Sequence, residues 1–375
     1  MKKVLSLTVA VALVAALLSI NVFGMSATSE GLRFKSYGDG TCYLHRSSTY
    51  NGTTIVIPPT SPEGDVVVCI DDEAFYNRSD VTSITLPHTV VNIGEGTFAG
   101  CSGLQSITIP DAVTSISGYA FLSCTGLTSI TIPNGVKEIG YHSFSYCDNI
   151  TTVKIPASVT ELGNYVFSFC PRLESISVDS ANTTYHSSSN CIIKTATKTL
   201  MLACKNSVIP SDGSVTAIGE GAFAGCSELT SISIPEGVTS IGANAFLDCR
   251  NLVSITIPST VTKIDSAALS DCLSLEKIYY DGSEEEWASI VKELYWDLGT
   301  GENTANGSYS VECSGSATDE PTTNASSTEA PETEQPEAED NAKPNGCTGS
   351  VSLGALAFVS VAGACTAIVK KKKDN

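Results

Sequence analysis

Apolar and polar side chains alternate along most of this chain in a pattern that repeats every 23 residues. One unit reads L-T-S-I-S-I-P-x-x-V-T-x-I-G-x-x-A-F-x-x-C, as in residues 229–249. Units begin at residues 81, 104, 127, 150 and 173, and again at 229, 252 and 275. In residues 104–109 two isoleucines alternate with Ser106 and Thr108, which predicts a short strand with one buried and one exposed face.

A single unit is too short to bury its own apolar side chains. Pro110 ends the predicted strand because proline cannot donate to a strand ladder. The apolar residues of 113–124 have spacings that suit a return segment and a short helical or 3₁₀ turn. Stacked units can bury these side chains together, with like strands pairing in a parallel sheet. The pattern therefore predicts a β-rich repeat solenoid.

One unit carries an insertion. The units that begin at Leu173 and Leu229 are separated by one period plus about 33 residues, which places extra chain at 179–207. Two apolar runs, 190–194 and 199–203, flank a four-residue turn and predict a β-hairpin. Such a projection can carry binding specificity, or it can be a spacer that packs locally. Both readings stay open.

The first residues have the features of a secretory signal peptide. Lys2 and Lys3 make the start positive, residues 4–20 are apolar, and small residues follow near position 24. We therefore expect residues 1–24 to direct export of the chain.

A second uncharged stretch lies near the other end. Residues 349–369 would span ~31 Å as a helix, which is the thickness of a bilayer core, and four lysines follow directly at 370–373. Basic residues stay on the cytoplasmic side. This arrangement predicts a single transmembrane helix, a cytoplasmic tail at 370–375 and a cell-surface location for the rest. A removed lipid-anchor signal is the alternative, which the terminal lysines disfavour.

The segments between these ends have distinct compositions. Ser283 and Glu286 have capping-box spacing, and Trp287, Val291, Leu294 and Tyr295 follow at helical spacing, so a capping helix is expected over the end of the stack. The later segment is acidic and rich in Ser, Thr and Pro, which predicts a flexible stalk. The expected parts are an N-terminal cap with a half-repeat (25–80), repeats (81–178), the insertion (179–207), repeats (208–274), a C-terminal cap (275–300) and the stalk (301–348).

Charge restricts the classes of partner. The 375 residues include 40 acidic and 21 basic side chains, for a net charge of −19. A polyanion repels phosphate backbones, so we expect no nucleic-acid partner. Contact with a membrane is expected only through the C-terminal helix.

Seven of the fourteen cysteines occupy one repeat position. Stacked side chains point the same way, and parallel Cβ vectors do not converge as a disulfide requires. We therefore expect buried free thiols, and no metal site, because the row lacks tetrahedral partners. Cys42 with Cys69, and Cys191 with Cys204, are candidate disulfides. The seven are Cys101, Cys124, Cys147, Cys170, Cys226, Cys249 and Cys272.

The exposed strand positions form a row that is the candidate binding face. Threonine simply favours exposed strands, which accounts for much of the row. The same broad, regular surface also suits docking of a partner, whereas an ice- or glycan-facing lattice fits less well because the row mixes residue types. The candidate residues are Ser106, Thr108, Ser129, Thr131, Thr152, Lys154, Ser231, Ser233, Ser254 and Thr256.

The sequence offers little for catalysis. Its four histidines, His45, His88, His142 and His186, are scattered, and no metalloprotease, nucleophile-elbow or phosphate-loop motif occurs. His88 and His142 occupy variable repeat positions, where exposure is expected. We predict no enzyme activity, no catalytic, cofactor-binding or metal-binding residues, and no cofactor.

The text I-P-x-x-V-x-x-I-G-x-x-A-F-x-x-C over residues 65–272 resembles the BspA-like leucine-rich repeat surface proteins. Residues 37–42 and 278–287 resemble the segments that flank the repeats in that family. Leu269 and Arg78 depart from the pattern, which expects Phe and Cys there. The resemblance implies a leucine-rich repeat solenoid on a cell surface, an adhesin whose partner is an extracellular protein or glycan, and no catalytic residues. The alternative is a structural, self-associating envelope protein without a host ligand.

Overall fold

The computed structural model describes residues 31–46, 50–301 and 308–315. The predicted signal peptide (1–24) and membrane anchor (349–369) lie outside these ranges. Within them, no helix has the length and apolar character needed to cross a membrane.

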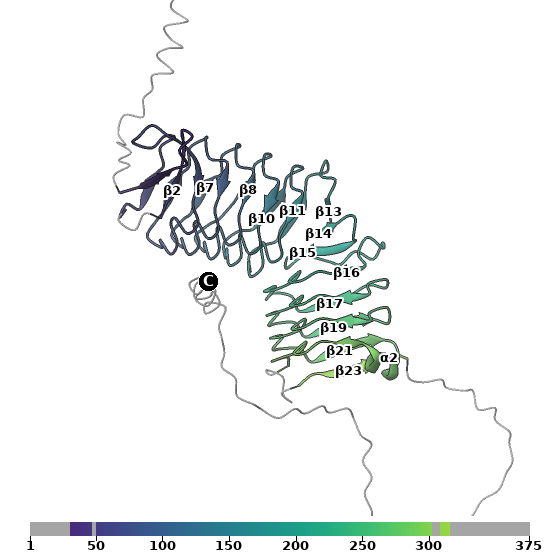
Figure 1. The fold of residues 1–375 in the computed structure, drawn as a ribbon. Coiled ribbons are helices and arrows are strands. Elements are labelled where there is room, and N and C mark those ends of the chain that lie inside the picture. The colour runs from purple at the N-terminus through teal and green to yellow at the C-terminus, as the bar shows by residue number, and fades with distance from the viewer. Residues whose placement is uncertain (1–30, 47–49, 302–307, 316–375) are drawn as a thin grey trace, which may run out of the picture. The chain divides into compact units, whose positions relative to one another are not determined.

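The repeats form a β-solenoid in which each 23-residue unit is one turn (Figure 1). Most turns carry two short strands, where the sequence pattern predicted one. The Ser-Ile-Thr text forms the first, as in β7 (Ser106–Thr108). The two residues before the Gly position of the repeat, which Ser117 occupies in this unit, form the second, as in β8 (Ser115–Ile116). Stacking of the units therefore produces two arrays of parallel strands.

The first array consists of three separate sheets. The register places equivalent residues side by side, as with Ser83 and Ser106. Residues 129–131, predicted as a strand, have no strand assignment, although Ile130 stays buried. The sheets are β3 (Thr54–Val56) with β5 (Ser83–Thr85) and β7; β10 (Thr152–Ile155) with β12 (Ser175–Val178); and β17 (Ser231–Ser233), β19 (Ser254–Pro258), β21 (Lys277–Asp281) and β23 (Ser310–Cys313).

The second array consists of two seven-stranded sheets on either side of an interruption. The first contains β1 (Arg33–Ser36), β2 (Thr41–His45), β4 (Val66–Ile70), β6 (Asn92–Ile93), β8, β9 (Glu138–Ile139) and β11 (Glu161–Leu162). The other contains β13 (Tyr185–Ser188), β14 (Cys191–Lys194), β15 (Thr199–Leu202), β16 (Ala217–Ile218), β18 (Ser240–Ile241), β20 (Lys263–Ile264) and β22 (Val291–Lys292).

The segment around each buried phenylalanine is a run of turns, so the predicted helical or 3₁₀ turn is wrong. Around Phe121, both Tyr119 and Ser123 have a positive φ of 57°. The N–H groups of these three residues donate to carbonyls in the next turn of the solenoid. A helix would direct those N–H groups within its own segment. Here they join successive turns, so the third side of the stack has its own ladder of hydrogen bonds, which we call the turn ladder.

The apolar residues point inward, as predicted. Phe121 is completely buried and its ring stacks on Phe98 and Phe144, with centroids 5.1 and 5.0 Å away. Thr108 is exposed on the outer face. Most of the buried side chains belong to two hydrophobic clusters, one within residues 32–204 and the other within 191–290.

The insertion contains the predicted hairpin, because β14 and β15 pair antiparallel about residues 195–198. It does not project from the solenoid. Successive residues of β14 face different clusters, because Ile192 packs in the first and Ile193 in the second. Their register partners on β15, Leu202 and Leu200, pack in the same clusters as they do. The hairpin is therefore a buried partition between two cores, which supports the reading of local packing.

The insertion affects only one side of the stack. At the turns that contain the phenylalanines, the Phe169 N–H donates directly to Ala224 O, so the chain passes from one regular turn to the next. In the second array, β13, β14 and β15 lie between β11 and β16. The strand array is interrupted here while the turn ladder continues.

The N-terminal end is closed by an antiparallel strand. β1 pairs antiparallel with β2, which covers the edge of the second array. Arg78 stands where the pattern expects Cys, and its guanidinium donates to Tyr50 O and Gly52 O at 2.6 and 2.9 Å. In this terminal turn the arginine ties the cap to the repeats, so the buried thiol of the regular units is not needed.

The C-terminal cap differs from the sequence prediction. The helix α2 (Glu284–Ser289) has the predicted capping box between Ser283 and Glu286. It ends at Ser289, because the chain then joins the second array as β22, and the predicted helical residues Leu294 and Tyr295 are 77% and 68% exposed. These side chains therefore do not cover the stack.

Other aromatic residues close this end. Trp287, Trp296 and Tyr309 pack against the second cluster, and β23 pairs with β21. The cap thus continues beyond residue 300 into the segment predicted as stalk. The acidic composition of that segment predicted no structure, although it contains β23 and, directly before it, Tyr309.

Candidate functional site

The ten candidate residues of the binding face lie on the first array or on its continuation at 129–131. Eight of them are exposed, and Ser254 and Thr256 are half-buried. Strand register brings Ser231 beside Ser254 and Ser233 beside Thr256. Because the array is divided into separate sheets, the structure places the candidates in groups and not in one unbroken ladder.

The hydroxyl groups of this face differ from other threonine hydroxyls of the solenoid. Those of Thr114, Thr160 and Thr262 donate to a carbonyl of the preceding turn. Within the described part of the chain, the nine hydroxyls of the candidate face have no protein partner, and Lys154 pairs with Asp179 at 2.8 Å. The face therefore presents hydroxyls that remain available to a ligand.

The row of cysteines consists of free thiols, as predicted. Cys124 Sγ donates to Phe98 O at 3.2 Å, and Cys147 Sγ donates to Phe121 O at 3.3 Å. Burial raises the pKa of Cys101 to about 12. Six of the seven thiols are thus small buried groups that also donate to a carbonyl of the preceding turn, whereas Cys226 is half-buried and makes no such bond in the described structure.

The two candidate disulfides are absent, because all four cysteines are free. Register pairs Cys42 with Val67 and Cys69 with Tyr43, so the first thiol enters the core while the second lies on the opposite side of the strands. Cys191 donates to Val208 O, and Cys204 lies 3.6 Å from the hydroxyl of Ser207. The last two thiols are buried among separate partners.

The histidines do not assemble into a site. His142, expected on the surface, is half-buried and stacks 4.6 Å from the Tyr165 ring, and burial lowers its pKa to about 4. His45 contacts Asp71 at 2.8 Å, and His186 contacts Thr195. Among the residues described, no group of three or more His, Cys, Asp or Glu side chains is placed to hold a metal ion.

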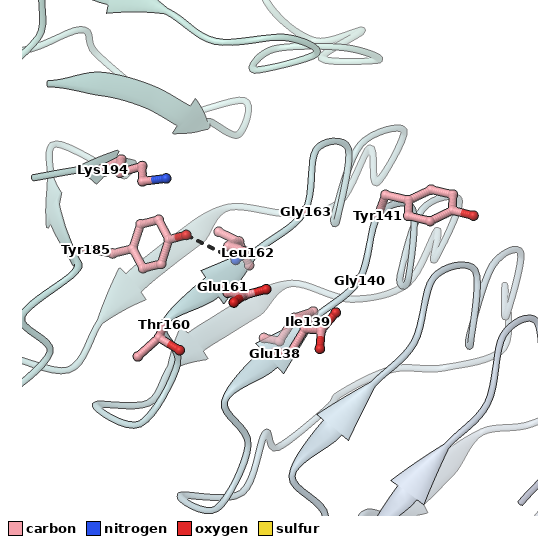
Figure 2. Close-up of a pocket in the computed structure, with 10 residues that line it drawn as sticks. All are labelled: Glu138, Ile139, Gly140, Tyr141, Thr160, Glu161, Leu162, Gly163, Tyr185 and Lys194. Atoms are coloured by element: carbon pink, nitrogen blue, oxygen red, sulfur yellow. Dashed lines mark hydrogen bonds between the residues drawn. The ribbon is translucent and has the colours of Figure 1, made fainter. Parts of the chain in front are cut away.

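A cleft of about 570 Å³ opens where the second array is interrupted (Figure 2). Sequence reasoning did not identify it. One wall is formed by β9 and β11 and includes Glu138, Thr160 and Glu161. The opposite wall is formed by the insertion and includes Tyr185 of β13 and Lys194 of β14.

Tyr185 holds the cleft open. It lies 23 residues after Leu162, at the position from which the next strand would pair with β11. Its hydroxyl instead accepts the Leu162 N–H at 3.0 Å, so a side chain stands where a backbone carbonyl would be. Tyr185 itself is almost completely buried, and burial raises the pKa of its phenol, which stays neutral. β11 consequently pairs with β9 alone.

The open edge of β11 exposes two acceptors. In the preceding turn, Lys137 O accepts N–H groups of Thr160 and Glu161, and Ile139 O accepts the Gly163 N–H. The equivalent carbonyls of β11 belong to Thr160 and Leu162. In the described structure neither receives a hydrogen bond from the protein.

The charges beside this edge are also unpaired. Glu138 and Glu161 are direct neighbours in the register of β9 and β11. Neither carboxylate has a cationic partner within 4 Å among the described residues, and neither does the Lys194 amine, which extends from the opposite wall. The 23-residue spacing of the two glutamates was readable from the sequence, whereas the displacement of β13 was not.

Comparisons with known proteins give a family match and several similar structures. The BspA type leucine rich repeat region matches residues 68–194 and 200–290, in six copies. No curated protein matches the chain.

Three similar crystal structures are leucine-rich repeat proteins of bacteria. The protein of T. pallidum is 26% identical, with 60% of this chain and 89% of that chain covered and a TM-score of 0.42. A leucine rich cell surface protein of Faecalibacterium prausnitzii is 26% identical, with 72% and 98% covered and a TM-score of 0.38. A protein of Bacteroides ovatus is 25% identical, with 70% and 66% covered and a TM-score of 0.48.

Proposed function

Because the chain belongs to the family of BspA-type leucine-rich repeat proteins, we propose that it is a cell-surface binding protein whose first strand array recognises a macromolecular partner. The observation that carries the proposal is the set of nine outward hydroxyls without protein partners. The predicted signal peptide (1–24) and anchor (349–369) would place the solenoid outside the cell. The similar protein of Faecalibacterium prausnitzii is described as a cell surface protein.

The chemistry of the face suits an extracellular protein or glycan. Each hydroxyl can donate one hydrogen bond and accept others, so the face can match the mixed donors and acceptors of a sugar or of a peptide backbone. Serine and threonine have short side chains, which limits the entropy lost when a partner fixes them. The parallel strands beneath hold their spacing, so the proposed recognition is by a preorganised surface and involves no catalysis.

Binding of the full chain to a panel of matrix glycoproteins and glycans tests this proposal. We expect saturable binding to at least one of them. Thr131→Arg and Ser231→Arg place bulk on the face and should weaken that binding at least about tenfold. Thr262→Arg lies outside the face and is the matched control. Absence of saturable binding across the panel would argue against adhesion, and equal effects of all three substitutions would argue against this face.

Self-association is a second candidate function, and exposed apolar side chains near the C-terminal cap favour it. Val291, Leu294, Tyr295 and Leu298 are between 55% and 77% exposed. Large exposed apolar groups commonly mark contact sites. Sedimentation of the full chain over rising concentration distinguishes this candidate, because self-association predicts a concentration-dependent mass without any added ligand.

A further inference from the structure

We propose that the cleft between β11 and β13 binds an extended, positively charged peptide segment of a partner protein, which adds as a strand to the open edge of β11. This site lies on the second array and is separate from the hydroxyl face. The inference therefore goes beyond the proposed function and does not depend on it.

The backbone of β11 requires donors. Its one outward N–H is already bonded to the Tyr185 hydroxyl, whereas the carbonyls of Thr160 and Leu162 have no protein donor among the residues described. These two carbonyls belong to alternate residues of a strand, about 6.6 Å apart. The Tyr185 hydroxyl lies between these carbonyls, where the carbonyl of an added strand would be, so the bound segment replaces this hydroxyl as the acceptor of the Leu162 N–H. An extended peptide presents N–H groups at the same interval along one edge, so two of them can then reach both carbonyls.

The two carboxylates beside the edge favour a positively charged side chain in the added segment. Glu138 and Glu161 stand side by side, and like charges directly opposite each other in a sheet are unfavourable. A lysine or arginine of the added segment would lie between the carboxylates and form charge-assisted hydrogen bonds with them. The net charge of −19 also attracts a basic partner over longer distances.

The opposite wall supplies the complementary contact. Lys194 faces the cleft from β14 without an ion-pair partner in the described structure. The outward carbonyls of an added strand would point toward that wall, where the lysine amine can donate to them. The cleft volume of about 570 Å³ is within the range of about 300–1,000 Å³ typical of ligand sites. A short extended segment therefore meets donors and acceptors that match its own.

The test measures fluorescence anisotropy of labelled peptides with the full chain. The probe is Thr-Val-Lys-Val-Thr, and the matched probe has Glu at its centre. We expect the lysine peptide to bind saturably, more weakly as salt rises, and the glutamate peptide to bind at least about tenfold less tightly. Glu138→Gln with Glu161→Gln should weaken the lysine peptide by a similar factor, whereas Glu228→Gln, an exposed control elsewhere, should not.

Backbone methylation separates strand addition from simple charge attraction. Of two lysine peptides N-methylated at either odd or even amides, one should lose binding and the other keep it, because only one edge of the strand faces β11. If both methylated peptides bind equally well, or if spermidine binds as tightly as the peptide, strand addition is wrong. Failure of the lysine peptide to bind at all also overturns the proposal. Both substituted residues are exposed, so the glutamine variants should remain folded, and thermal melts check that they do.

Discussion

Two backbone positions in each turn are held in the left-handed region. They lie two residues before and two residues after the buried phenylalanine. Around Phe98 both are glycine, Gly96 and Gly100, whereas around Phe121 they are Tyr119 and Ser123. Left-handed backbone costs a side-chain-bearing residue about 1–2 kcal/mol. The N–H bonds to the next turn hold these residues in place, so the strain is the local cost of joining the turns.

Ser123→Gly should therefore stabilise the protein. Relief of the left-handed backbone outweighs the extra freedom that glycine gives the unfolded chain. The expected net gain is about 0.5 kcal/mol in the free energy of unfolding, measured by urea denaturation. Ser106→Gly on β7 is the control, because Ser106 has no positive φ and glycine weakens a strand. A loss of stability at both positions would contradict the strain argument.

The buried thiols predict how stability depends on pH. Burial raises the pKa of Cys101, Cys170 and Cys272 to about 12, from 9.0. The folded state then keeps its protons where the unfolded chain releases them. The contribution is complete below pH 9 and is lost as the pH rises toward 12, by about 1.4 kcal/mol per pH unit for each thiol.

Urea denaturation at pH 7.5, 9 and 10.5 measures this loss. Cys101→Ala removes one titrating thiol, so its stability should fall less steeply above pH 9 than that of the unsubstituted chain. Tyrosines whose pKa burial also raises contribute in the same direction in both proteins. Identical slopes would show that Cys101 does not titrate in this way.

Among the elements, the sequence predicted those that depend on nearby residues. The hairpin at 191–202, the capping box of α2 and the alternation of β7 arise from local patterns. The second array was missed because strands as short as Ser115–Ile116 carry no periodic signal and form only by pairing with the next turn. The cleft was missed for a similar reason, since it depends on a single bond between Tyr185 and Leu162.

The stacked phenylalanine row gives a prediction for the repeating element. Phe121→Ala leaves a cavity between two stacked rings and should cost roughly 3–5 kcal/mol of unfolding free energy. Thr108→Ala removes an exposed hydroxyl without a protein partner and should cost little. Chemical denaturation of both variants measures the difference. Small effects at both positions would contradict the assignment of inner and outer faces.

Over the whole solenoid, stability is divided at the insertion. The hairpin of β14 and β15 shares its two faces between the clusters, so most apolar contacts are made within one cluster or the other. In stacked repeats each turn contacts mainly its neighbours, and stability approximates a sum of local terms. The clusters are joined chiefly through the hairpin and through the turn ladder between Phe169 and Ala224.

Hydrogen exchange measured by mass spectrometry on the full chain tests this division. Phe246 is completely buried in the second cluster, so Phe246→Ala should accelerate amide exchange through residues 208–290 and leave residues 81–170 protected. Phe121→Ala, in the first cluster, should produce the reverse pattern. The paired variants serve as each other's controls because both remove a stacked ring from an equivalent repeat position. If either substitution accelerates exchange equally in both regions, the hairpin transmits unfolding between the cores, and the solenoid unfolds as one cooperative unit.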